Sequence, residues 1–303
     1  MRAFAAFSLL VVLPGLARAA VSDDSWASST LDAARAAFSA KPLPAVPSTP
    51  VDEGERIRAA VLAQFERNPV AARFAAPVIK IPGAVTFLVR GESEDKSLKG
   101  AWATFKRDSR SMVLNRDAIN EDLASLGRAR PCDDVVPGRP LSPQQLSAIA
   151  KRYLPVFAHE LGGHARHYAE LAVILGAPAP NARETEIDAL RLEAMTTAAE
   201  RKTDSNYLRD DAAYARGESA LVDKYWESKE KNDPALFRDY VSAVPGYAKI
   251  PMAPAGPIAD YYRDDERRLL MADQALIGND PPSDEIGIGR RTPFDDGPGR
   301  GRR

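Results

Sequence analysis

The chain is poor in cysteine, and Cys132 is the single example among 303 residues. One thiol cannot form an internal disulfide, and it has no second cysteine with which to complete a redox motif. Cys132 lies beside Pro131 in a turn-rich stretch, and we interpret it as incidental rather than as a nucleophile. Core packing and any bound metal must therefore supply the stability of the fold.

An excess of charge of one sign is also absent, because 41 basic residues are balanced by 42 acidic ones. No basic stripe stands out, so we expect no nucleic-acid partner. After the first twenty residues the chain has no apolar run that approaches the roughly 20 residues of a membrane-spanning helix. We therefore expect a globular protein without stable membrane insertion.

The N-terminus is typical of an export signal. Arg2 supplies a basic start, residues 3–13 are apolar, and Ala17-Arg18-Ala19 forms an A-x-A cleavage pattern. The alternative is a buried N-terminal helix. We expect residues 1–19 to be removed and the mature protein to be secreted or periplasmic.

The rest of the sequence predicts a mainly helical α+β protein. Periodicity and turn residues predict helices over 31–40, 52–67, 117–126, 142–153, 156–176 and 181–199, a strand over 85–90 and a hairpin over 101–114. The helix from 142 begins with Ser142 as N-cap and Gln145 as its partner in a capping box. The region up to about 275 is mostly helical, with an interruption over 245–257.

All three histidines lie close together, at positions 159, 164 and 167. Imidazole is a common zinc ligand, and Glu160, directly after His159, can accept a proton from a metal-bound water. A regular helix would place the imidazoles of His159 and His164 roughly 140° apart. A single π-bulge would return both to one face, and Gly162-Gly163 is where such a bulge would form most easily.

The third ligand is expected from the helix over 181–199. Glu184 falls roughly 60° from the centre of its apolar stripe, whereas Glu186, Asp188 and Glu193 lie about 100° or more away. The sequence therefore favours Glu184 as the ligand. Asp188, one turn later, would accept a hydrogen bond from the ring nitrogen of a ligating imidazole that does not bind the metal, and would thereby fix the tautomer of that ring.

HELGGH (159–164) and ETEID (184–188) together resemble the gluzincin metallopeptidases. The lengthened H-E-x-x-x-H form is similar to that of dipeptidyl peptidase III, although the glutamate segment of that enzyme lies farther along its chain. This resemblance implies that His159, His164 and Glu184 bind Zn²⁺. It further implies that Glu160 is the general base, that Asp188 is the orienting residue and that the hairpin over 101–114 aligns the peptide.

Several alternatives remain open at this point. The histidines could be solvated residues on a surface helix, Glu184 could cap its own helix with Asn181 as N-cap, and Asp188 could pair with Arg191. In an unbulged helix, Glu160, His164 and His167 would share one face and form a different ligand set. An oxyanion donor could be one of three tyrosines, namely Tyr247, Tyr261 and Tyr262.

These observations predict a zincin-like core with a small antiparallel sheet or hairpin and an active-site helix pair, followed by a helical C-terminal region. The expected organisation is a signal (1–19), a helix and proline-rich linker (20–50), a metal-binding catalytic region (51–200), a helical region (201–278) and a disordered tail (279–303). The expected function is zinc-dependent hydrolysis of peptide or protein substrates. The alternatives are a non-catalytic binding or scaffold protein and a zinc amidase acting on a non-peptide substrate.

Overall fold

The computed structural model describes residues 51–81, 83–176, 181–211, 213 and 217–279. The predicted signal, the helix over 31–40, the proline-rich linker and all but the first residue of the predicted tail lie outside the described residues. Among the described helices, none combines the length and the apolar character needed to cross a bilayer.

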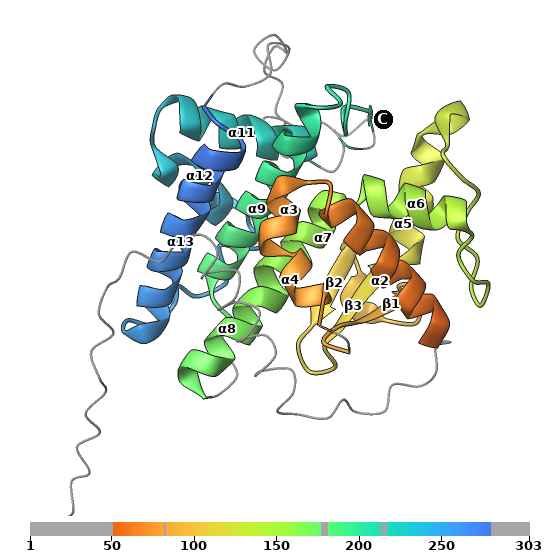
Figure 1. Cartoon of the computed structure of the whole chain (residues 1–303), viewed down its shortest axis with the longest axis horizontal. Coiled ribbons are helices and arrows are strands. Elements are labelled where there is room, and N and C mark those ends of the chain that lie inside the picture. Colours follow the sequence, from red (N-terminus) through yellow and green to blue (C-terminus); the bar gives the residue numbers. More distant parts are fainter. Residues whose placement is uncertain (1–50, 82, 177–180, 212, 214–216, 280–303) are drawn as a thin grey trace, which may run out of the picture.

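The described chain is mainly helical and contains one small sheet (Figure 1). The main elements run in the order α2 (Val51–Phe65), α3 (Pro69–Phe74), α4 (Ala76–Ile79), β1 (Thr86–Arg90), β2 (Ala103–Lys106), β3 (Ser111–Asn115), α5 (Arg116–Ser125), α6 (Pro143–Arg152), α7 (Leu154–Phe157), η3 (Ala158–Ala165), α8 (Arg166–Leu175), α9 (Arg183–Arg201), α11 (Glu218–Glu230), α12 (Pro234–Ala243) and α13 (Pro257–Leu276). The helices and strands predicted within this range are thereby confirmed. The capping box of Ser142 and Gln145 is present at the start of α6.

The sheet has the strand order β1-β3-β2. Strands β2 and β3 form the predicted antiparallel hairpin, but β1 pairs with β3 in parallel, so the sheet is mixed and the expectation of an antiparallel one is wrong. The reason is that β3 is the central strand. One edge of β3 pairs with β2 in the hairpin, and its other edge pairs with β1, which runs in the same direction as β3.

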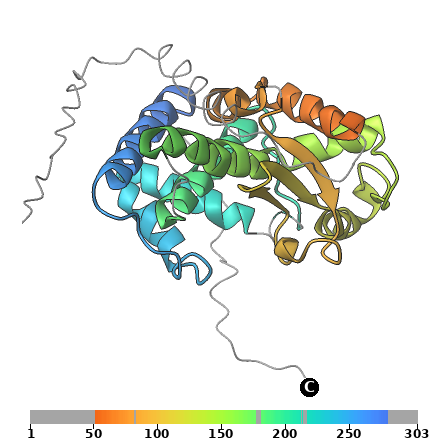
Figure 2. The same ribbon diagram turned by 90° about the horizontal axis from the view of Figure 1, so that it is seen from below.

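Helix α9 lies at the centre of the described fold. The sheet and α2 lie to one side of it, and α11, α12 and α13 lie to the other (Figure 1). The view from below shows the same division, with the C-terminal helices at one end and the sheet at the other (Figure 2). Residues on several faces of α9 are buried, among them Ile187, Ala189, Leu192 and Met195.

The segment η3 is a π-helix that joins α7 to α8 and packs directly on α9. The predicted irregular turn is therefore confirmed. Gly163 also has a second role, because a Cβ atom at this position would lie 2.4 Å from Cβ of Ala189. Gly162 is less confined, since its added Cβ would lie 3.3 Å from Cδ1 of Leu192.

We predict that Gly163→Ala destabilises the fold by roughly 1–3 kcal/mol, because the added methyl group forces η3 away from α9. Gly162→Ala is the matched control. Its nearest contact is with the end of the flexible Leu192 side chain, and its contacts with Ala75, at 3.4 and 3.5 Å, are at ordinary van der Waals distance. The gain in helix propensity offsets these contacts, so we expect a change below about 1 kcal/mol. Denaturant unfolding of both variants measures the difference, and equal free energies of unfolding would contradict the tight contact.

Candidate metal centre

The π-helix brings the imidazoles of His159 and His164 together. Their Nε2 atoms are 3.2 Å apart, and their ring centroids are 5.0 Å apart. Each π-helical turn contains more residues than an α-turn, so two side chains five positions apart project from the same side. The π-helical turn thus brings the two imidazoles of the H-E-x-x-x-H sequence to one side, where a regular α-helix would hold them apart.

A carboxylate from α9 completes this group, and it belongs to Glu186. Its Oε2 lies 3.5 Å from Nε2 of His164 and 3.8 Å from Nε2 of His159. Glu160 also lies in the group, with a ligand atom within 4.8 Å of those of the two histidines. Two imidazoles and two carboxylates therefore converge in a largely buried position.

The structure does not bring Glu184 to this group, in contrast to the prediction from sequence. Its Oε2 accepts a hydrogen bond of 2.9 Å from the backbone N–H of Ala253, and its side chain lines a cavity elsewhere on α9. The capping alternative is also wrong, because the N-cap is Ala182 and it makes no side-chain cap.

The reason lies in which face of α9 meets η3. The sequence predicts that the apolar stripe of α9 faces η3, but the contact with Gly163 is made by Ala189. Glu186 precedes Ala189 by three residues and Glu193 follows it by four, so all three share one side of the helix. A helix that is buried on several sides has more than one inward face.

Glu193, and not Asp188, lies against the outer nitrogen of a histidine in this group. Its Oε2 lies 2.9 Å from Nδ1 of His159, which leaves Nε2 of that ring directed at the centre. Asp188 instead lies near the third histidine, with 3.7 Å between its Oδ2 and Nε2 of His167. The alternative, an ion pair between Asp188 and Arg191, is not found among the described residues, where Arg191 lies 3.7 Å from Oε1 of Glu266 instead.

Glu160 is held by the edge strand of the sheet. The backbone N–H of Phe105, in β2, donates a hydrogen bond of 2.7 Å to its Oε2. Glu160 is 8% exposed, so its carboxylate has little contact with bulk water. The hairpin predicted over 101–114 is thus in direct contact with the site.

The electrostatics of the site favour a cation at its centre. Burial alone would lower the pKa of His159, but the hydrogen bond to Glu193 and the charges of Glu193, Glu160 and Glu186 raise it to about 9. Burial would raise the pKa of Glu186, but the two imidazoles lower it and keep the carboxylate ionised. The metal-free site therefore holds a proton on His159 near neutral pH.

His167 belongs to a separate buried cluster with Asp188 and Asp265. Arg166 already occupies the cation position there, since its Nη2 lies 2.9 Å from Nε2 of His167 and 2.6 Å from Oδ2 of Asp265. Burial and the Arg166 charge lower the pKa of His167 to about 4. The alternative ligand set of Glu160, His164 and His167 is therefore wrong.

The three tyrosines are placed differently. Tyr261 and Tyr262 lie edge-on to the His167 ring, and the Tyr261 hydroxyl donates a hydrogen bond to Glu170. Tyr247 lies in the loop between α12 and α13. Burial, followed by the charges of Glu186, Glu193 and Glu160, raises the pKa of its hydroxyl.

The chain finds no match among models of protein families, among curated proteins or among solved structures. The candidate site therefore rests on its own geometry.

Because the folded-state pKa of His159, about 9, exceeds its ordinary value of 6.5, protonation of this ring stabilises the metal-free fold. That stability is fully present below pH 6.5 and is lost as the pH rises towards about 9. We predict that Glu193→Gln reduces this loss. Free energies of unfolding in chelator at pH 6, 7.5 and 9 measure it, with the exposed Glu121→Gln as control. Parallel pH profiles for the wild type and Glu193→Gln would contradict the assignment.

Proposed function

We propose that the protein is a zinc-dependent metallopeptidase whose ion is held by His159, His164 and Glu186. The observation that carries this proposal is the spacing of the three ligand atoms, at 3.2, 3.5 and 3.8 Å. A tetrahedral zinc ion with bonds of about 2.0–2.1 Å sets its ligand atoms about 3.3 Å apart. The three atoms therefore need to move little to share one ion.

The donor set also fits a catalytic zinc. Two imidazoles and one carboxylate are a common ligand set of zinc hydrolases, and they leave a fourth position for water. The bound ion would lower the pKa of that water and polarise a carbonyl group. Glu193 fixes the tautomer of His159 through the Nδ1 contact, as is usual for carboxylates that lie behind a ligating imidazole.

Glu160 is the proposed general base. It lies beside the ligand atoms without being needed as one, and the hydrogen bond from Phe105 aims its carboxylate. It would take a proton from the attacking water and pass it to the leaving amine. Tyr247 is the proposed donor to the developing oxyanion, because the charges of the three carboxylates act on its hydroxyl and its raised pKa keeps that hydroxyl protonated.

Peptides are the proposed substrate class because of strand β2. This strand pairs with β3 alone in the described sheet, and it contacts η3 beside Glu160. An edge strand can align an extended peptide backbone next to the catalytic groups. We further propose that the enzyme acts in the periplasm or outside the cell, on the strength of the export signal expected at residues 1–19.

Two conservative substitutions on α9 distinguish this site from the one predicted from sequence. We expect purified wild-type protein to retain close to one equivalent of zinc, and Glu186→Gln to lose most of it because a neutral amide is a poor ligand. Glu184→Gln, two residues away, is the matched control and should retain the metal. Metal analysis after dialysis measures both. Loss of zinc in Glu184→Gln with retention in Glu186→Gln would contradict the ligand assignment.

The catalytic roles predict variants that keep the metal and lose activity. Glu160→Gln should lower kcat by roughly 10²–10⁴-fold, and Tyr247→Phe should lower kcat by about 10-fold or more with little effect on KM. Peptide-library cleavage with metal analysis of each variant measures both. Zinc binding without cleavage of any peptide by the wild type would favour a non-catalytic protein or an amidase with another substrate.

A further inference from the structure

Arg166 is the first residue of α8, and it has no exposed surface. Its side chain returns to the π-helical turn before it, where its Nε donates a hydrogen bond of 2.6 Å to the backbone carbonyl of Gly162. Its two terminal nitrogens each donate a hydrogen bond of 2.6 Å to a carboxylate oxygen of Asp265, on α13. One side chain therefore joins η3 to a residue that lies 99 positions later in the chain.

The hydrogen bond to Gly162 depends on the π-helical turn. In a regular α-helix, the backbone N–H of Arg166 would bond to the carbonyl of Gly162, four residues earlier. In η3 this N–H bonds instead to the carbonyls of Leu161 and Gly163. The side chain of Arg166 thus gives Gly162 a hydrogen bond in place of the one that its own backbone does not make.

The contact with Asp265 also depends on this turn. A π-bulge holds one more residue than a regular turn, so in a regular helix all residues after it would be rotated by about 100° relative to α7. Arg166 would then point away from Asp265, just as His164 would point away from His159. The ion pair is therefore available in the same turn that brings the two imidazoles together.

The buried position of this ion pair is costly. The side chains of Arg166 and Asp265 are both fully buried, and an apolar pair of similar volume often stabilises a protein as well or better. Burial would raise the pKa of Asp265, but the charge and hydrogen bonds of Arg166 hold it well below its ordinary value, so both partners are ionised. Such pairs can select one conformation over a competing one. The competing conformation of η3 is a regular α-helix.

Neighbouring groups hold the ion pair in place. The guanidinium group of Arg166 lies over the ring of Phe74, in α3, with 5.5 Å between Cζ and the ring centroid. Its Nη2 lies 2.9 Å from Nε2 of His167. Arg268, one turn along α13, lies 2.9 Å from Oδ1 of Asp265. The position of the Gly162 carbonyl is thereby coupled to both α3 and α13.

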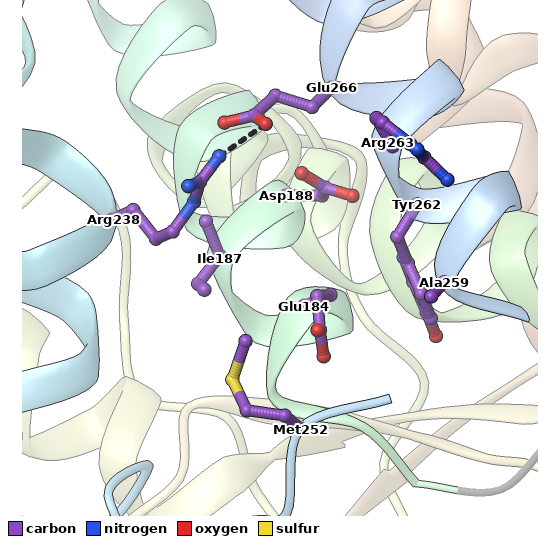
Figure 3. A pocket seen from close by; sticks show the side chains of 9 residues that line it. All are labelled: Glu184, Ile187, Asp188, Arg238, Met252, Ala259, Tyr262, Arg263 and Glu266. Carbon is purple, nitrogen blue, oxygen red and sulfur yellow. Dashed lines mark hydrogen bonds and ion pairs between the residues drawn. The ribbon is translucent and has the colours of Figure 1, made fainter. Parts of the chain in front are cut away.

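The next residue of α13 faces a different environment. Glu266 lines a cavity of about 330 Å³ and forms an ion pair with Arg238 of α12, which Figure 3 shows as a dashed line. None of the proposed metal ligands lines this cavity. The pair of Arg238 and Glu266 thus links α12 to α13 rather than α13 to η3, which makes it a natural control for the pair of Arg166 and Asp265.

We propose that Arg166 and Asp265 are positioning residues of the metal centre, which hold η3 in the π-helical turn where His159 and His164 face one ion. The inference rests on the metal site proposed above. The two residues act through the backbone of η3 and not as ligands.

Two variants test this role through the dissociation constant for zinc. Arg166→Lys keeps the charge opposite Asp265, but the single nitrogen of lysine lacks the planar fork that serves both Gly162 and the carboxylate. The double variant Arg166→Met with Asp265→Leu removes both charges together, which avoids an unpaired buried charge and favours a folded protein. We expect each variant to raise the dissociation constant about 10- to 100-fold, as for other groups that orient metal ligands.

Two further measurements separate positioning from a general loss of stability. The visible absorption spectrum of the Co²⁺-loaded variants should differ from that of the wild type, because the two imidazoles no longer meet at one ion. In the metal-free protein, the backbone amides of residues 162–167 should exchange with solvent faster than in the wild type. The amides of α6 should exchange at the wild-type rate in the same samples.

Arg238→Met with Glu266→Leu is the matched control, and it should leave both the zinc constant and the exchange of η3 unchanged. Wild-type zinc binding and amide exchange in the folded Arg166 variants would overturn the inference, and so would effects of equal size in the control. A wild-type protein that binds no zinc would contradict the proposed metallopeptidase instead. The amide exchange of the metal-free protein would then still decide whether the ion pair holds the turn.

Discussion

The contact between Gly163 and Ala189 is the constraint on which the rest of the site depends. A Cβ at Gly163 would lie 2.4 Å from that of Ala189, so the close approach of η3 to α9 leaves no room for a side chain at Gly163. This approach brings the carboxylate of Glu186 within reach of both imidazoles and that of Glu193 within reach of His159. A larger residue at either position would separate the ligands as well as the helices.

The charge balance of the site follows from the same packing. Three carboxylates, Glu160, Glu186 and Glu193, surround two imidazoles in a largely buried space. A proton on His159 satisfies part of this negative charge in the metal-free state, and a divalent cation would satisfy more of it. The arrangement therefore favours positive charge between the carboxylates, and a proton and a bound cation would compete for the same ring.

Local sequence signals predicted much of the fold. The helices, the hairpin, the capping box at Ser142 and the irregular turn at Gly162-Gly163 all depend on residues close together in the chain. The same is true of His159, Glu160 and His164 as a cluster. The choice among the acidic residues of α9 was not local, because this helix is buried on more than one side. The signal that was missed is a small residue, Ala189, positioned to meet the glycine pair, with Glu186 and Glu193 on its side of the helix.

The cavity behind α9 explains why Glu184 and Asp188 look like functional residues without belonging to the metal group. They share one turn of spacing and one face of the helix, and that face turns towards α13. Helix α9 thus carries two pairs of acidic residues on different faces, Glu186 with Glu193 and Glu184 with Asp188. The helical periodicity of the sequence predicts this division into pairs. Only the packing of α9 in the fold decides which pair faces the histidines.

Anomalous diffraction at the zinc edge, from crystals of the zinc-loaded protein, tests the central claim most directly. The account predicts one strong peak bonded to Nε2 of His159, Nε2 of His164 and a carboxylate oxygen of Glu186, with Glu184 bound to Ala253 as in the metal-free fold. A peak coordinated by Glu184, or crystals with η3 regular and no peak between the two imidazoles, would contradict it.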